Sequence, residues 1–276
     1  MGKKINNQII KVIEDLMERL MDKVLITDPF IKENHHLNKP LYAALVPDEI
    51  FKGAHLERRF VTPFGGVWEK LAYVTALSHH GHCEKEKSID GFVGSESLRR
   101  IQEVLNNLEH KRKDGKKIKP NWKKELEYVM EGGGDPVPTS VICDIYIESR
   151  VNSKKYAFEL KAPLPNSDQT KVSKEKIFKL LCMKPKKVDA SFFALPYNPY
   201  GEKKDYKWSF PMRWFNMHND ECVLIGDEFW NLIGGDGTYQ NFISELNSVG
   251  LKYRKIIYRE FLGIEPPKGF DKNILK

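Results

Sequence analysis

Two carboxylates and one ammonium group, those of Asp144, Glu159 and Lys161, stand at a spacing that could build a site for a metal ion. They lie in two neighbouring stretches in which apolar and polar residues alternate, as is typical of β-strands. A two-residue turn at Asn152-Ser153 would place Asp144 opposite Lys161, and Tyr146 opposite Glu159. Successive side chains of a strand point to opposite faces. The three charged residues therefore share one face, and a slip of two residues keeps them together.

Two neighbouring carboxylates repel each other unless a cation lies between them. Mg²⁺ is a natural occupant, because it is held by one or two carboxylates and keeps several water molecules. Such a metal can activate a water molecule and stabilise negative charge on a phosphodiester. Lys161 could orient the nucleophile or offset the charge that develops. A cross-strand ladder of salt bridges on an exposed sheet face would use the same residue types, so these residues alone leave a purely structural role open.

The surrounding pattern predicts an α/β fold in which a central mixed sheet is flanked by helices. Strands are expected at 137–148, 155–161 and 190–197. Apolar residues spaced by three and four predict helices at 5–25, 173–183 and 239–246. A further helix is expected to start at 67, after Gly65-Gly66, and another to run from a Ser95 or Ser97 cap to 108. Residues 29–66 are expected to be irregular. We expect a single nuclease domain, with a helical N-terminal region (1–66), a catalytic core (67–200) and a C-terminal region (201–276) that could contribute to DNA recognition.

Composition limits the class of protein. The chain has 276 residues, 41% of them hydrophobic, which excludes a disordered or collagen-like chain. The 45 Lys and Arg against 38 Asp and Glu give a net charge of +7, which favours a polyanionic partner. The four cysteines are scattered, and neither a signal peptide nor a membrane-spanning run is recognisable. A reduced cytoplasmic protein is expected.

Several segments resemble a known family. Asp144 followed by Glu159-Leu160-Lys161 resembles the PD-(D/E)xK nuclease motif, with Cys143 in the place of its proline. The strings VICDIYIE (141–148), FELKAPLPNSDQTKVSKEK (158–176) and ALPYNPYG (194–201) resemble the TdeIII type of restriction endonuclease. Together they cover less than a quarter of the chain.

The resemblance implies a restriction-endonuclease-like core and a type II enzyme that cleaves double-stranded DNA with Mg²⁺ at GGNCC-like sites. A homodimer would match a palindromic target, and a cognate DNA methyltransferase would be the system partner. Asp144 and Glu159 would be the metal ligands, and Lys161 the catalytic lysine. A structure-specific repair nuclease or resolvase of the same superfamily, and a non-catalytic DNA-binding protein, are the alternatives.

Further candidates surround this site. The resemblance also implies a glutamate from a preceding helix near the metal, for which Glu69 is preferred over Glu103 and Glu109, because Gly65-Gly66 would let a backbone approach closely at the helix start. Each of these glutamates could equally be a solvated surface residue.

Three groups of residues could contact DNA. Gln169, Lys171 and Lys174 stand at the start of the helix after the catalytic strand, where backbone N–H groups favour phosphate. The basic stretch 111–124 could also contact phosphates or be a solvated loop. Arg213, in an aromatic segment, could read a guanine in the major groove.

His79, His80, His82 and Cys83 lack the second pair of ligands that a zinc site needs.

Overall fold

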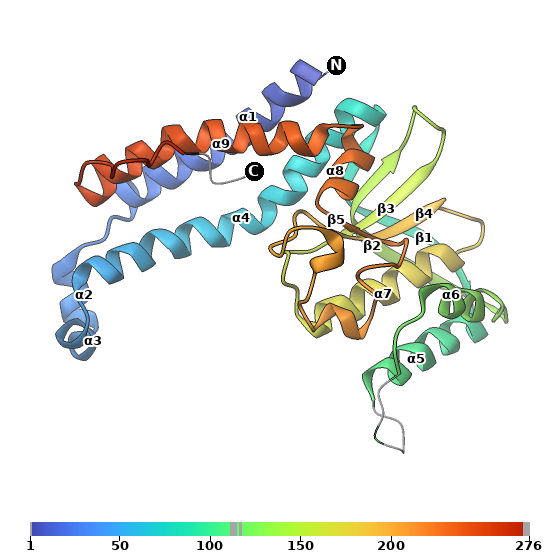
Figure 1. Cartoon of the computed structure of the whole chain (residues 1–276). Helices are drawn as coiled ribbons and strands as arrows, with labels where there is room; N and C mark the ends of the chain where they lie inside the picture. Colours follow the sequence, from blue (N-terminus) through green and yellow to red (C-terminus); the bar gives the residue numbers. More distant parts are fainter. Residues whose placement is uncertain (1, 111–114, 116–117, 273–276) are drawn as a thin grey trace. The chain divides into compact units, whose positions relative to one another are not determined.

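The alternating stretches fold into one mixed sheet with the strand order β1-β2-β3-β4-β5 (Figure 1). Strands β1, β2 and β3 pair antiparallel, and β3, β4 and β5 pair parallel. Their bounds are β1 (Cys83–Gly94), β2 (Pro136–Glu148), β3 (Lys155–Leu160), β4 (Ala190–Leu195) and β5 (Val223–Ile225). The computed structural model describes residues 2–110, 115 and 118–272. The predicted α/β class with a central mixed sheet is confirmed.

Helices cover both faces of this sheet (Figure 1). One face packs against α5 (Ser95–Glu109), α6 (Trp122–Met130) and α7 (Ser167–Cys182), and on this side Trp122 stacks on Phe178 with ring centroids 5.0 Å apart. The other face packs against α8 (Asp227–Gly234), whose Phe229 lies edge-on to Phe158 of β3. Two short 3₁₀ turns, η2 (Lys203–Asp205) and η3 (Pro211–Arg213), follow β4.

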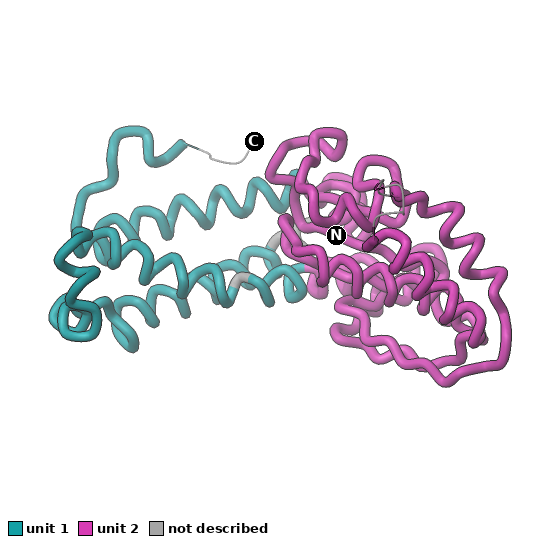
Figure 2. The backbone as a smooth tube through the Cα atoms, turned by 90° about the horizontal axis from the view of Figure 1, so that it is seen from below, with its two compact units in different colours: residues 1–71, 240–276 teal, residues 72–239 magenta. Residues whose placement is uncertain are grey.

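The chain forms two compact units (Figure 2). Residues 72–239 hold the sheet, and residues 1–71 and 240–276 make the other unit, which is helical in its described part. The helical unit contains α1 (Gly2–Asp22), η1 (Lys23–Thr27), α2 (Lys32–Asn38), α3 (Pro40–Leu45), most of α4 (Asp48–His80), α9 from its third residue (Thr238–Ile256) and η4 (Ile257–Leu262). No described helix has both the length and the apolarity to cross a membrane. The predicted three-part division of a single nuclease domain stays a prediction.

The expectation of an irregular segment at 29–66 is wrong, since α2, α3 and the first half of α4 occupy it. Helix α4 begins at Asp48 and continues through Pro63 and Gly65-Gly66, residues that usually interrupt helices. Gly65 and Gly66 are therefore inside a helix instead of at its start. A Cβ built on either glycine meets no atom within 4 Å, so neither is needed for a close backbone approach.

The start of α5 also differs from the expected serine cap. The N-cap position is Gly94, and no side chain caps the helix there. The hydroxyls of Ser95 and Ser97 accept hydrogen bonds from the backbone N–H groups of Asp135 and Gly133 instead. A Cβ on Gly94 would lie 1.9 Å from the Gly133 carbonyl oxygen, so glycine is required for this contact. The two serines thus tie the start of β2 to α5.

The hairpin between β2 and β3 is shifted by two residues from the expected register. Tyr146 pairs with Ala157 instead of Glu159, and Glu148 pairs with Lys155. The loop is longer than the predicted two residues because Ser149 is anchored before it: its hydroxyl bonds to the His80 ring, and the N–H of Arg150 donates to the His80 carbonyl. A shift of two residues conserves the face of every side chain.

Candidate active site

The three charged residues singled out by the sequence meet on the sheet face that packs against α7. The Lys161 ammonium lies 2.8 Å from Oδ2 of Asp144 and 3.4 Å from Oε2 of Glu159. Oδ2 of Asp144 also accepts a hydrogen bond from the backbone N–H of Leu160, at 2.7 Å. This bond fixes the Asp144 carboxylate against the neighbouring strand. The predicted grouping of Asp144, Glu159 and Lys161 is therefore present in the structure.

A second lysine completes this group, and the sequence did not indicate it. Lys176 extends from α7, and its Nζ lies 2.9 Å and 3.1 Å from the two carboxylate oxygens of Glu159. The same ammonium donates to the backbone carbonyl of Ile142, at 2.7 Å. Lys176 ends the string that resembles the TdeIII type, but only the packing of α7 on the sheet shows which way its side chain points.

Burial and the neighbouring charges both shift the pKa values of Glu159 and Lys161. Burial raises the pKa of Glu159, whose side chain is only 1% exposed, and the charge of Asp144 raises it further, while Lys161 and Lys176 lower it. Burial lowers the pKa of Lys161, but the two carboxylates outweigh burial and leave that pKa raised. Lys161 is therefore a cation at neutral pH.

The oxygen atoms of this group are suited to a hard divalent cation. Among the described residues, the two donors to the Asp144 carboxylate, the Leu160 N–H and the Lys161 ammonium, both bond to Oδ2, and none bonds to Oδ1. Glu159 offers a second carboxylate nearby. No group of three or more His, Cys, Asp or Glu side chains among the described residues is arranged to hold a metal ion. A metal here would thus have two carboxylate ligands and retain water, as Mg²⁺ commonly does.

Comparison with known proteins places the chain in a family. The family model described as "type II restriction endonuclease, HinfI" matches residues 5–250. The chain belongs to this family. The type II restriction enzyme HgiCII of Herpetosiphon aurantiacus is 27% identical over 229 residues, covering 81% of this chain and 82% of that enzyme. The enzyme HgiBI of the same organism is 26% identical over 223 residues, covering 77% of each.

The predicted activity is thereby confirmed: the chain is a type II restriction endonuclease, a hydrolase that acts on double-stranded DNA. The match is to the HinfI family, and the narrower TdeIII resemblance stays a prediction. Membership of the PD-(D/E)xK superfamily likewise stays a prediction.

The expected role of Lys174 in this endonuclease needs correction. Its side chain is 0% exposed, and its ammonium pairs with Glu125 and donates to the carbonyl of Trp214. The rings of Phe215, Phe178 and Trp122 surround the same ammonium at 4.9–5.8 Å. Lys174 therefore belongs to the core of the endonuclease, and it does not present its charge to a DNA backbone.

The other predicted DNA contacts lie on the surface of the endonuclease. Gln169 is exposed, and its backbone N–H is capped by Asn166 at the start of α7. Lys171 is partly exposed and forms an ion pair with Glu109. The hydrogen bond from Lys171 is the main cause of the lowered pKa of Glu109. The charge of Arg213 contributes slightly to the same shift. Arg213 is partly exposed, and among the described residues its guanidinium has no hydrogen bond or ion pair.

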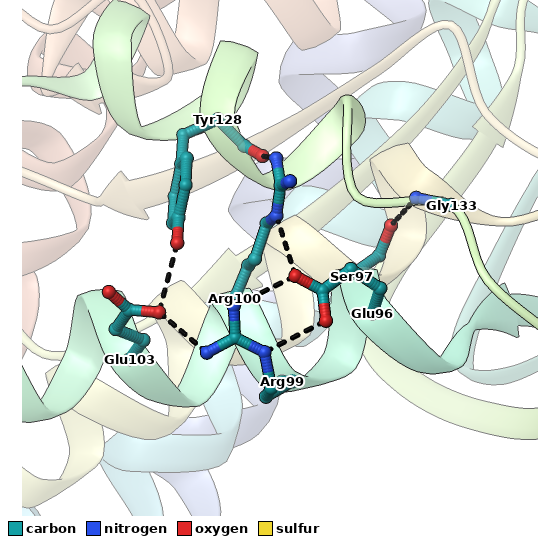
Figure 3. A network of polar contacts seen from close by, with 7 residues as sticks. All are labelled: Glu96, Ser97, Arg99, Arg100, Glu103, Tyr128 and Gly133. Atoms are coloured by element: carbon teal, nitrogen blue, oxygen red, sulfur yellow. Dashed lines mark hydrogen bonds and ion pairs between the residues drawn. The ribbon is translucent and has the colours of Figure 1, made fainter.

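The candidate helical glutamates of the endonuclease lie in different places. Glu103 binds Arg99 and accepts from the Tyr128 hydroxyl, in a network that links α5 to α6 (Figure 3). Figure 3 also shows Glu96 between Arg99 and Arg100, whose hydrogen bonds lower the pKa of Glu96 to about 2. Glu103 and Glu96 are thus both hydrogen-bonded to arginines of the same helix.

Glu69 lies on α4 within the 1–71 part of the chain and is half-buried. Its expected position beside a metal stays a prediction. The argument from Gly65-Gly66 that favoured it does not hold, because both glycines are inside α4.

The histidine segment has a packing role. His80 is buried, and its Nε2 donates to the Leu232 carbonyl at 3.0 Å, so that Nδ1 accepts from the Ser149 hydroxyl at 2.7 Å. His82 lies 3.0 Å from Glu84 on β1. In the basic stretch 111–124, residues 111–114 and 116–117 lie outside the described residues.

Proposed function

We propose that Asp144, Glu159 and Lys161 are the catalytic residues of this endonuclease, in a site of the PD-(D/E)xK type. The observation that carries the proposal is the contact of one ammonium, that of Lys161, with both carboxylates. A surface ladder of salt bridges would leave its members exposed. Glu159 is instead buried to 1% exposure, where a carboxylate is costly unless cations accompany it.

Asp144 and Glu159 would hold Mg²⁺, which supplies an activated water and offsets charge on the scissile phosphate when it is bound. The Leu160 N–H and Lys161 hold Oδ2 of Asp144, so that Oδ1 faces away from both donors and is free to bind. Lys161, with its raised pKa, acts as a fixed cation that orients the nucleophile and offsets negative charge on phosphate oxygens. It is not suited to act as a general base, because it keeps its proton at neutral pH.

The proposal extends to the substrate and the assembly. GGNCC-like sequences are the first candidate targets, with Gln169 and Lys171 on the DNA backbone and Arg213 on a guanine. Two copies would cut the two strands of a palindromic site. Leu37, Leu41 and Leu45 of α2 and α3 are 79–81% exposed, and we infer that copies meet at these leucines. A cognate methyltransferase would protect the DNA of the host, and the enzyme would act in the cytoplasm of a prokaryote.

Digestion of a fully sequenced, unmethylated phage DNA tests this function. We expect discrete fragments with Mg²⁺, none with EDTA and none with Lys161→Ala, and the fragment ends would give the recognition sequence. A smear would favour a structure-specific nuclease. DNA that is bound with a steep salt dependence but stays intact would favour a non-catalytic binding protein.

A further inference from the structure

Lys176 gives the candidate metal site an unusual balance of charge. The ion pairs of the group join two carboxylates, Asp144 and Glu159, to two ammonium groups, Lys161 and Lys176. The charges of these same three partners, Asp144, Lys161 and Lys176, shift the pKa of Glu159. The formal charge of the four side chains is therefore zero, whereas the triad of Asp144, Glu159 and Lys161 alone would carry one negative charge.

The two lysines differ in how they engage Glu159. Lys161 approaches one oxygen of this carboxylate at 3.4 Å and is bonded mainly to Asp144. Lys176 contacts both oxygens of Glu159, at 2.9 and 3.1 Å, and is held in place by the Ile142 carbonyl. Lys176 thus makes the closer contact with the buried carboxylate.

We propose that Lys176 is a positioning residue that neutralises Glu159 in the metal-free enzyme and thereby keeps divalent-metal binding weak until DNA is present. The inference rests on the proposed metal site at Asp144 and Glu159. A divalent cation that enters a site of zero net charge gains less attraction than one that enters a site of charge −1. Phosphate groups of bound DNA add the missing negative charge, so that metal binding and DNA binding favour each other.

The test measures metal affinity without DNA. Mn²⁺ is titrated into the full-length protein, and free Mn²⁺ is followed by electron paramagnetic resonance. Lys176→Gln removes the charge but keeps an N–H donor for Glu159, and we expect it to bind Mn²⁺ at least about tenfold more tightly than the natural chain. Lys179→Gln is the matched control: it removes a lysine of the same helix, which pairs with Glu175, and we expect a change of less than about twofold.

Two further variants distinguish this effect from misfolding and from a different site. Lys176→Arg keeps the charge and should keep the weak affinity of the natural chain. Adding Asp144→Asn to Lys176→Gln should abolish the gain, because the tighter site needs both carboxylates. Thermal unfolding of each variant, with and without Mn²⁺, checks the fold and gives a second measure of binding, since a bound metal raises the unfolding temperature.

An unchanged or weaker affinity of folded Lys176→Gln overturns the inference, as does a gain that survives Asp144→Asn. The proposed function is judged separately, by Mg²⁺-dependent cleavage of DNA by the natural chain. If the natural chain cleaves DNA but Lys176→Gln binds Mn²⁺ no more tightly, only the inference about Lys176 falls. If Lys176→Gln binds more tightly but the natural chain does not cleave, the inference stands and the proposed catalytic site falls.

Discussion

Replacing Lys174 with methionine tests whether this residue belongs to the core or to the DNA-binding surface. Methionine fills a similar volume among the aromatic rings, so that the change removes mainly the charge and its hydrogen bonds. Two groups lose the ammonium as a partner: the Glu125 carboxylate, which is 12% exposed and keeps the N–H of Asn121, and the buried Trp214 carbonyl. Breaking a buried ion pair in this way costs about 3–5 kcal/mol of unfolding free energy.

Urea unfolding followed by tryptophan fluorescence measures this loss, because Trp122 and Trp214 lie beside the ammonium. Lys171→Met is the control: its pair with Glu109 is partly exposed, and we expect a loss of about 1 kcal/mol or less. Adding Glu125→Leu to Lys174→Met should recover most of the stability, because the carboxylate that loses its ion-pair partner is then removed as well. A Lys174→Met protein that unfolds at the normal urea concentration but binds DNA weakly would refute the assignment to the core.

Three other predictions concern base reading, pH and assembly. Arg213→Ala should slow cleavage about 10- to 100-fold, the effect of losing one bidentate base contact, and a normal rate would exclude Arg213 as a guanine reader. Burial lowers the pKa of His80 below its ordinary value of 6.5, so the stability that depends on its neutral form is complete above pH 6.5 and is lost as the pH falls. The unfolding temperature should therefore drop less between pH 7.5 and 5.5 in His80→Gln than in the natural chain, and equal drops would contradict this account. Leu41→Lys should shift sedimentation toward the monomer without changing the unfolding temperature, whereas an unaltered dimer would show that the copies meet elsewhere.

The charged group on β2 and β3 could be predicted because it depends only on strand alternation. The register was wrong by two residues, yet Asp144, Glu159 and Lys161 still share a face, since the side-chain period of a strand is two. The shift itself could not be predicted from the hairpin sequence, because the anchor for Ser149 is His80, far away in the chain.

Helix α7 shows where local reasoning failed. The prediction that Lys174 contacts the DNA backbone rests on its place at the start of the helix after the catalytic strand. Lys174 nevertheless lies on the same face as Thr170, Ser173, Ile177 and Phe178, all of them buried. Spacings of three and four residues back from Ile177 and Phe178 would have placed Lys174 in the core. No comparable signal identifies Lys176, because its partner Glu159 is on another element and only the packing of α7 on the sheet brings them together.

The most direct test of the proposed catalytic site is Asp144→Asn, which keeps the shape of the side chain but removes the negative charge from the proposed metal ligand. Binding to the mapped site is measured with Ca²⁺ in place of Mg²⁺, and single-turnover cleavage of the same DNA is measured with Mg²⁺. We predict that cleavage falls at least about a hundredfold while the affinity for DNA changes less than about threefold. Cleavage by Asp144→Asn at the rate of the natural enzyme would contradict the assignment of Asp144, Glu159 and Lys161 as the catalytic residues.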